Sequence, residues 1–520
     1  MSRFYVTTPI YYINAEPHLG HTYTTVIADT LARFHRARGD ETFFLTGTDE
    51  HGDKVAAAAA AAGETPRAYA DRLSRIFRDT WDACGFRYDY FVRTTDAAHI
   101  RVVQDYLSRV HANGDIYFGR YGGLYCTGCE RFYTEKELRD GKCPDHETVP
   151  TFIEEDNYFF RMTRYQGALI AHLEVHPETI TPDRYRNEVL SILRAEALPD
   201  LCISRPKHRL LWGIELPFDR DYVTYVWWDA LVNYVSALKA QGEATFDALW
   251  PATHHLIGKD ILKQHGIFWP TMLMAMGLPL FHRLLVHGYW VRGESKMSKS
   301  LGNVIRPLEM KARYGLDALR YFLLREMSFG QDATFSEDAF VTRVNADLAN
   351  NLGNLVSRTL SMQQRYFGGE VQPLGPWTAE DQDLAGAFAV AYREVPRLME
   401  HYSFHLALEA LWRAIDHANK YVVVTAPFTL VKDAAQRPRV GSILHHLLEA
   451  LHATAVLLQW ALPETSARIC TLLGHDAVSR LPADLAWGTH FPAGARTEKP
   501  VALFPRIETD EAAAAAPVTR

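Results

Sequence analysis

The first fifty residues alternate between two hydrophobic patterns, and this alternation restricts the fold more than any other feature of the chain. Residues 4–12 read FYVTTPIYY, a β-branched and aromatic run typical of a buried strand. Residues 21–39 place apolar side chains at helical spacing and end at Gly39, which favours a helix C-terminus there. A second strand pattern, TFFLTGTDEHG, follows at 42–52. A strand, a helix and a strand in this order predict a parallel α/β sheet.

The hydrophobic period changes several times along the rest of the chain and predicts its domain organisation. Short polar strand patterns and clustered cysteines after Gly114 indicate an inserted domain, and nearly every segment after Phe340 has the 3.6-residue period of helices. The predicted regions are 1–113 and 218–293 for the two halves of the α/β domain, 114–217 for the insertion, 294–339 for a connecting region, 340–485 for a helical domain, and 486–520 for a C-terminal segment with a disordered end.

Composition excludes some classes of protein. The net charge of −7 over 520 residues argues against nucleic-acid binding through a uniformly basic surface, although local basic patches remain possible. The N-terminus lacks a signal-peptide pattern, and no apolar run is long enough for a transmembrane helix, so we expect a cytoplasmic protein without a membrane partner. Three of the six cysteines fall within 126–143, which favours a metal site in a reducing compartment over a disulfide framework.

The sequence PHLGH at 17–21 lies between the first predicted strand and the first helix, where parallel α/β sheets bind ligands. A helix N-terminus there offers free backbone N–H groups and partial positive charge to a phosphate. Gly20 would allow another group close to the backbone, and His18 and His21 are one helical turn apart. Taken alone, the pattern also fits two surface histidines at the start of a helix.

A second short stretch, ESKMSKSLGN at 294–303, places Lys296 and Lys299 on either side of a Met-Ser pair. No hydrophobic period runs through it, so neither a helix nor a core strand is expected. Taken alone, it could be a solvated basic loop.

PHLGH and KMSKS, in this order, resemble the two signatures of class I aminoacyl-tRNA synthetases. The blocks TTPIYYINAEPHLGH, FLTGTDEHG, YVWWDALVNY, HLIGKD, HGYWVRGESKMSKSLGN and NNLGNLVSR resemble those of the methionyl-tRNA synthetase family, in that family's order and over nearly the whole chain. The resemblance implies a Rossmann-like nucleotide-binding catalytic domain with an inserted zinc-knuckle domain, followed by an all-α anticodon-binding bundle.

Two pairs of metal-ligand residues lie in the predicted insertion. CTGC contains Cys126 and Cys129, and CPDH contains Cys143 and His146. Three thiolates and an imidazole at this spacing fit tetrahedral zinc, and four protein ligands leave no open position. We therefore predict one structural zinc ion per chain, as in the one-knuckle members of the family.

The family's reaction is ligation of methionine to tRNA. The resemblance implies that methionine and ATP, accompanied by Mg²⁺, form methionyl-adenylate, whose methionyl group then passes to the 3' end of initiator and elongator tRNA(Met). The attacking carboxylate is already ionised at pH 7, so no general base is required. His18 and His21 would stabilise the phosphates, and Lys296 and Lys299 would close over the leaving group. The remaining predicted ATP residues are Gly20, Gly258, Asp260 and Arg205.

A thioether needs an apolar, polarisable pocket. Matching the blocks predicts a methionine pocket formed by Ile10, Tyr12, Trp227, Ala230, Leu231, Tyr234, Ile261 and His265, with Asp49 as partner of the substrate ammonium. Without the resemblance, these aromatics would read as ordinary core. Leu231 and Gln264 depart from residues common in the family, which puts the tolerance for methionine analogues in doubt.

The helical domain is where this family reads the anticodon. Matching blocks predict that Asn350, Asn354, Arg358 and Phe428 contact it, with Phe428 in place of a tryptophan. No appended C-terminal tRNA-binding domain is visible, so we expect a monomer. Two alternatives remain open: another class I synthetase, such as that for cysteine, in which an open metal site holds the substrate thiol, and a synthetase-like protein that only binds RNA.

Overall fold

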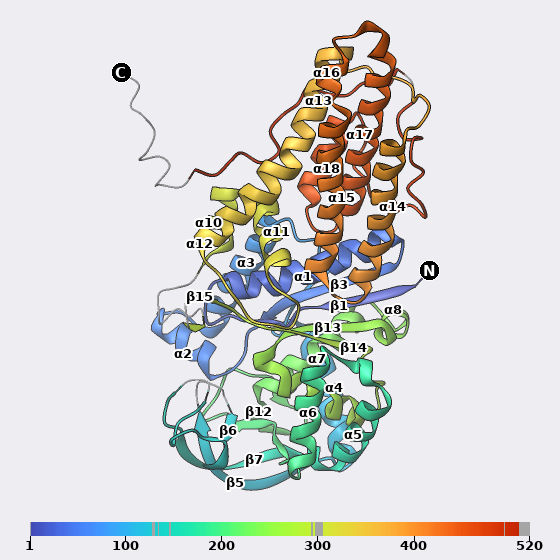
Figure 1. Ribbon diagram of the computed structural model, residues 1–520. Helices are drawn as coiled ribbons and strands as arrows, with labels where there is room; N and C mark the ends of the chain where they lie inside the picture. Colours follow the sequence, from blue (N-terminus) through green and yellow to red (C-terminus); the bar gives the residue numbers. More distant parts are fainter. Residues whose placement is uncertain are drawn as a thin grey trace, which may run out of the picture. The chain divides into compact units, whose positions relative to one another are not determined.

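The computed structural model describes residues 2–126, 131–133, 135–144, 147–292, 295–296, 305–492 and 494–508, and it consists of two compact units (Figure 1). The first, here called the sheet unit, comprises Arg3–Ala28 and Thr42–His287. The second, the helical unit, comprises Met1–Ser2, Asp29–Glu41 and Gly288–Arg520. Each unit is described separately below.

A seven-stranded sheet forms the centre of the sheet unit, in the order β2-β3-β1-β13-β14-β8 with β4 also paired to β3. The strands are β1 (Arg3–Thr7), β2 (Tyr11–Tyr12), β3 (Glu41–Asp49), β4 (Tyr90–Arg93), β8 (Ile180–Thr181), β13 (Thr253–Gly258) and β14 (Arg283–His287). The described strand pairings are parallel. The predicted opening is confirmed: α1 (Leu19–Arg38) connects the first strands and ends before Gly39, whose φ of 89° is left-handed.

The sheet unit also contains a series of helices, some of which contact strands of this sheet. They are α2 (Asp53–Ala61), α3 (Pro66–Ala83), α4 (Ala97–Ala112), α5 (Gln166–Val175), α6 (Asp183–Ala195), α7 (Val226–Ala240), α8 (Glu243–Leu249) and α9 (Trp269–Met276). Helix α7 is buried on nearly all sides from Trp228 to Leu238, and it packs against α4. Its continuous apolar sequence reflects that position in the core.

Two antiparallel sheets lie in the region predicted as an insertion, except for one strand, Asp219–Thr224, which begins beyond the predicted end at residue 217. One consists of β5 (Ile116–Cys126), β6 (Arg131–Tyr133), β7 (Thr151–Phe160) and β9 (Leu201–Cys202), and the other of β10 (Ser204–Pro206), β11 (Glu215–Leu216) and β12 (Asp219–Thr224). Strand β8 falls inside the same predicted range, 114–217, yet Ile180 pairs with Leu284 in the main sheet. The chain thus returns to the central sheet within this range before it forms β9.

The helical unit contains a small sheet and a bundle of long helices (Figure 1). The sheet consists of β15 (Trp290–Arg292), β16 (Ser295–Lys296) and β17 (Ala333–Thr334). The helices are α10 (Pro307–Tyr314), α11 (Leu316–Glu326), α12 (Glu337–Arg343), η8 (Val344–Gly353, π-helical), α13 (Asn354–Phe367), α14 (Ala379–Glu400), α15 (Phe404–Thr425), α16 (Pro427–Leu430), α17 (Arg437–Leu458) and α18 (Pro463–Leu472). Helices α14, α15 and α17 pack against one another, which confirms the helical period predicted after residue 340.

One stretch among the described residues, Ala434–Leu458, is long and apolar enough to cross a membrane by length and composition. In the bundle, 94% of its apolar window is buried, as expected for a central core helix.

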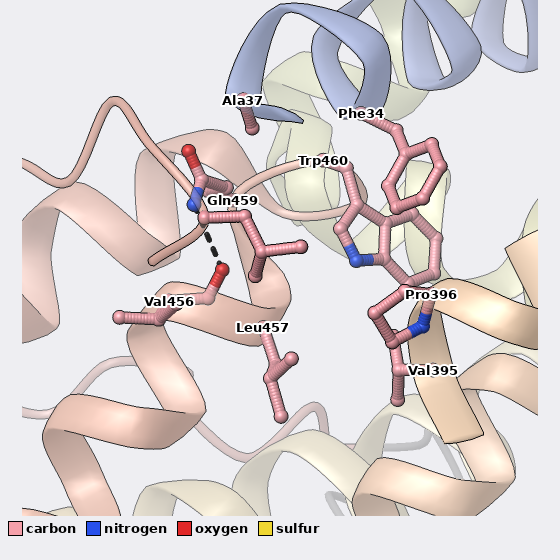
Figure 2. A pocket seen from close by; sticks show the side chains of 9 residues that line it. Phe34, Ala37, Val395, Pro396, Val456, Leu457, Gln459 and Trp460 are labelled. Atoms are coloured by element: carbon pink, nitrogen blue, oxygen red, sulfur yellow. Dashed lines mark hydrogen bonds between the residues drawn. The ribbon is translucent and has the colours of Figure 1, made fainter. Parts of the chain in front are cut away.

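A pocket in the helical unit lies where the end of α1 meets the bundle (Figure 2). Its lining is apolar except for the Gln459 amide, which donates to the Val456 carbonyl at 2.9 Å. The lining residues are Phe34, Ala37, Val395, Pro396, Val456, Leu457, Gln459, Trp460 and Leu481, and none of them is a predicted site residue. We interpret the pocket as a packing gap beside Pro396, which interrupts α14.

Candidate active site

The PHLGH turn places its two histidines against each other at the start of α1. The rings of His18 and His21 are stacked, with centroids 3.8 Å apart. The backbone N–H of Gly20 donates to Nδ1 of His18 at 3.1 Å, and the N–H of His18 donates to Nδ1 of His21 at 3.3 Å. Because each Nδ1 accepts a hydrogen bond, the proton of each neutral ring lies on Nε2. Both rings are therefore prepared to donate from Nε2.

Gly20 is required by this packing. A Cβ atom at position 20 would lie 2.9 Å from Cε1 of His18. Any other residue would push the His18 ring out of its stack, so the sequence needs glycine here for a close approach of side chain to backbone.

Strand β3 ends at the predicted ammonium partner, Asp49. In the parallel ladder, Asp49 is the register partner of Tyr12 on β2, so the structure brings these two predicted pocket residues together. The next residue, Glu50, is fully buried, and Arg93 donates to both of its carboxylate oxygens at 2.7 and 2.9 Å. Asp49 thus lies at the end of β3, directly before a residue that an ion pair with Arg93 holds in place.

The residues of the predicted methionine pocket come from three segments of the sheet unit. Ile10 and Tyr12 pack on a small cluster that contains Ala230. Ile10, Trp227 and Ile261 also pack on the main core, which contains Leu231 and Tyr234. Ile10 thus packs on both clusters, whereas Tyr12 packs on the smaller cluster and Trp227 and Ile261 pack on the larger one.

His265 is buried in the π-helical turn η6 (Gln264–Phe268). Its Nδ1 donates to the Ile261 carbonyl at 3.0 Å, and the Tyr234 hydroxyl donates to its Nε2 at 2.7 Å. Burial lowers the pKa of His265 to about 4, so the ring is neutral at pH 7. Tyr234 and His265 thus form a neutral pair among the residues of the predicted methionine pocket, and such a pair suits an uncharged thioether.

Arg205 is fully buried in the same unit. Its guanidinium lies 3.8 Å from the ring centroid of Tyr225, and its Nη1 donates to the Ser204 carbonyl at 2.8 Å. Burial alone would lower its pKa, but Cys202, Tyr225 and Tyr125 outweigh that effect, so the pKa lies above the usual value and the group stays charged.

The predicted adenosine contacts lie at the carboxyl end of β13. Gly258 is the last residue of this strand, and a Cβ there would lie 2.6 Å from Oδ1 of Asp260. Strand β13 pairs with β1, so this end of the strand faces the ligand-binding edge typical of parallel sheets. Lys296 belongs to β16 in the helical unit, where its partner in the ladder is Val291, and Lys299 lies outside the described residues.

Two of the four predicted zinc ligands lie in the described part of the insertion. Cys126 and Cys143 are both buried in one small cluster with Tyr133, and the backbone N–H of Cys143 donates to Thr148 at 2.9 Å. Cys129 and His146 lie outside the described residues, and among those described no group of three or more metal-ligand side chains comes together. Two buried thiols in one cluster fit one half of a thiolate-rich zinc site.

Three of the four predicted anticodon residues lie on one exposed strip of the helical unit. Asn350, Asn354 and Arg358 are exposed and follow at intervals of one turn along η8 and α13. The Asn354 amide donates to the Asn350 carbonyl at 2.8 Å. Phe428 on α16 is 47% exposed. Such solvent-facing amide and aromatic groups can bind unpaired bases.

Sequence reasoning missed two residues that the structure places beside the site. The imidazole of His51 and the carboxylate of Asp229 are 2.6 Å apart, although 178 positions separate them in the chain. Their residue types could have indicated a role, because both are titratable and lie inside the blocks TDEHG and WWDA. Only their neighbours in these blocks were predicted as site residues.

Comparison with known proteins identifies the family. The family model for class I tRNA synthetases (M) matches residues 4–149 and 136–360, and that for the anticodon-binding domain of methionyl tRNA ligase matches 371–516. The methionine–tRNA ligase of Caldanaerobacter subterraneus is 42% identical over 510 residues, which cover 98% of this chain and 79% of that protein. That of Deinococcus radiodurans is 43% identical over 512 residues, covering 97% and 74%.

A solved structure supports the same family. Mycobacterium tuberculosis methionyl-tRNA synthetase bound by methionyl-adenylate is 40% identical and superposes with a TM-score of 0.92, covering 97% of this chain and 100% of that one. The chain therefore belongs to the methionyl-tRNA synthetase family of class I aminoacyl-tRNA synthetases, with a catalytic domain followed by the family's helical anticodon-binding domain.

Proposed function

We propose that the chain is a methionine–tRNA ligase, which activates methionine with ATP and transfers it to initiator and elongator tRNA(Met). The observation that carries this proposal is the match over 97% of the chain to a synthetase with methionyl-adenylate bound. The arrangement of His18, His21 and the Tyr234–His265 pair supports it, because it combines phosphate donors with a neutral, apolar pocket.

In the first step, the methionine carboxylate attacks the α-phosphorus of ATP and pyrophosphate leaves. Asp49 holds the substrate ammonium, and Nε2–H of His18 and of His21 donates to phosphate oxygens. Lys296 and Lys299 bring positive charge to the leaving group, while Gly258, Asp260 and Arg205 complete the ATP site. Magnesium bound to ATP supplies further charge neutralisation. Because the chain has only to place charges, no general base is required.

In the second step, a hydroxyl of the terminal tRNA ribose attacks the methionyl carbonyl, and AMP leaves. Asn350, Asn354, Arg358 and Phe428 select the tRNA by contacts with the anticodon bases. The same proposal includes a structural zinc at Cys126, Cys129, Cys143 and His146, the domain boundaries expected from the sequence, a monomeric state and a cytoplasmic location.

Pyrophosphate exchange tests the reaction. The chain is supplied with ATP, labelled pyrophosphate and each of the twenty amino acids in turn, and we expect exchange with methionine. Exchange with cysteine instead would favour the cysteine alternative, and no exchange with any amino acid would favour an RNA-binding protein. Charging of initiator tRNA(Met) with labelled methionine then tests the second step.

A further inference from the structure

The last residue of β3, Asp49, and the two residues that follow it, Glu50 and His51, each have a different partner. Asp49 is the register partner of Tyr12, a predicted pocket residue, and Glu50 is bound by Arg93. His51 turns toward α7, where its Nδ1 lies 2.6 Å from Oδ2 of Asp229. The two residues that directly follow Asp49 are therefore both held by charged polar contacts.

Asp229 uses both of its carboxylate oxygens. Its Oδ1 lies 2.8 Å from Nε2 of His99, whose Nδ1 is 2.7 Å from the Ser236 hydroxyl. A carboxylate only accepts hydrogen bonds, so both imidazoles donate to it. Asp229 is 1% exposed, and burial alone would raise its pKa, but His51 and His99 outweigh burial and hold the pKa below its usual value. The group is thus an ionised, fully bonded anchor.

Trp212 makes further contacts with the loop after β3. The Trp212 ring lies 5.2 Å from the His51 ring, its indole N–H donates to the Glu50 carbonyl at 2.5 Å, and the Gly52 N–H donates to the Trp212 carbonyl at 3.2 Å. His51 is consequently confined between Trp212 and Asp229, and it is only 6% exposed.

We propose that Asp229 and His51 form a positioning pair, which holds the Asp49 loop in register with the pocket residues of α7. Asp229 lies between Trp227 and Ala230 on α7, whereas His51 is two residues after Asp49. One charged hydrogen bond thus joins the segment that binds the substrate ammonium to the helix that lines the thioether pocket. Methionine needs both ends at a fixed separation, whereas ATP does not. The inference rests on the proposed function.

The test compares variants of the full chain in methionine-dependent pyrophosphate exchange. His51→Leu removes the donor, Asp229→Asn changes the acceptor at nearly constant volume, and His51→Asn keeps an N–H close to the Nδ1 position. We expect the first two to raise the KM for methionine about tenfold or more, because each breaks a hydrogen bond to a charge. The KM for ATP should change less than about twofold, and His51→Asn should keep the methionine KM within about threefold.

Ser236→Ala is the matched control, since it alters the far end of the same network without touching His51. A normal methionine KM in Asp229→Asn, with only a lower melting temperature, would mean a merely structural role and overturn the proposal. Equal rises in both KM values, or a His51→Asn variant as impaired as His51→Leu, would also overturn it. A wild type without methionine-dependent exchange overturns the proposed function itself, whereas an active wild type with unaffected variants overturns the pair alone.

Discussion

The Tyr234–His265 pair allows a quantitative test of the methionine pocket. Tyr234→Phe removes one hydroxyl and leaves Nε2 of His265, a buried acceptor, without the donor that lies 2.7 Å away. Leaving one buried polar atom unpaired costs about 1–3 kcal/mol, or roughly 5- to 150-fold in an equilibrium or rate. His265→Leu leaves the Tyr234 hydroxyl unpaired in the same way. We expect each single variant to lose kcat/KM for methionine within this range.

The double variant distinguishes the pair from two independent residues. With both partners apolar, no buried donor or acceptor of the pair remains unsatisfied, so the double loss should be smaller than the sum of the single losses by about 0.5–3 kcal/mol. The Ile261 carbonyl loses its partner in His265→Leu with or without the Tyr234 change, so this contribution cancels in the cycle.

The assay is methionine-dependent pyrophosphate exchange, with each ratio of kcat/KM converted to a free energy. Tyr165→Phe is a suitable control, because it removes a hydroxyl that donates to Asp115 at 2.8 Å, outside the predicted pocket. Its loss should stay under about twofold. Losses that add to within about 0.3 kcal/mol would refute the coupling, and equal effects on the KM for ATP would refute the assignment to methionine.

Four further predictions follow from the proposed function and from the described contacts. Lys299→Ala should reduce adenylate formation far more than methionine binding, and a normal exchange rate would contradict its role. Phe428→Ala should weaken tRNA charging with exchange near normal, because we propose that the exposed ring contacts the anticodon and takes no part in adenylate formation; equal losses in both assays would indicate a structural residue. Cys143→Ser should lower the zinc content measured by elemental analysis, and wild-type chain without zinc, produced with zinc present, would rule out the site. The helical unit should lose stability as the pH falls below 6.5: burial lowers the pKa of His452 to about 4, so the unfolded chain binds more protons between pH 4 and 6.5. A melting temperature measured by circular dichroism that is constant over this range would contradict the last prediction.

The opening of the fold was predictable because its signals are local. The strand run at residues 4–12, the helical spacing that follows and the stop at Gly39 each lie within a few residues, and α1 ends at Arg38 as expected. Strand β8 was not predictable in this way. It has two residues, Ile180 and Thr181, too few for a period, and its place in the main sheet depends on pairing with Leu284 and Leu285, about a hundred positions further along the chain.

Two π-helical segments among the described residues were also beyond sequence reasoning. The segment η6 carries His265, and η8 carries Asn350. In η8, a Cβ at Gly353 would lie 2.9 Å from the Leu348 carbonyl, so glycine permits the wider turn. An apolar period does not distinguish a π-helical turn from an α-helical one, although such turns are frequent at functional sites.

The histidines of the sheet unit show why residue type alone could not assign the site chemistry. A backbone N–H donates to Nδ1 of His18 and of His21, so these neutral rings donate from Nε2. His265 instead donates from Nδ1 to a carbonyl, so its Nε2 accepts. His51 donates from Nδ1 to a carboxylate.

These opposite roles depend on one neighbouring atom at each imidazole, and that atom comes from the backbone turn or from a distant helix. A motif can therefore indicate that histidines gather at the site, but only the folded contacts decide which nitrogen carries the proton. It follows that no single replacement suits all four positions. Glutamine, whose terminal N–H lies near the Nε2 position, is the closer substitute at His18 and His21, whereas asparagine is the closer one at His51. At His265, a substitute has to donate to the Ile261 carbonyl from one side of the ring position and accept from the Tyr234 hydroxyl on the other side. Neither asparagine nor glutamine reproduces both contacts together.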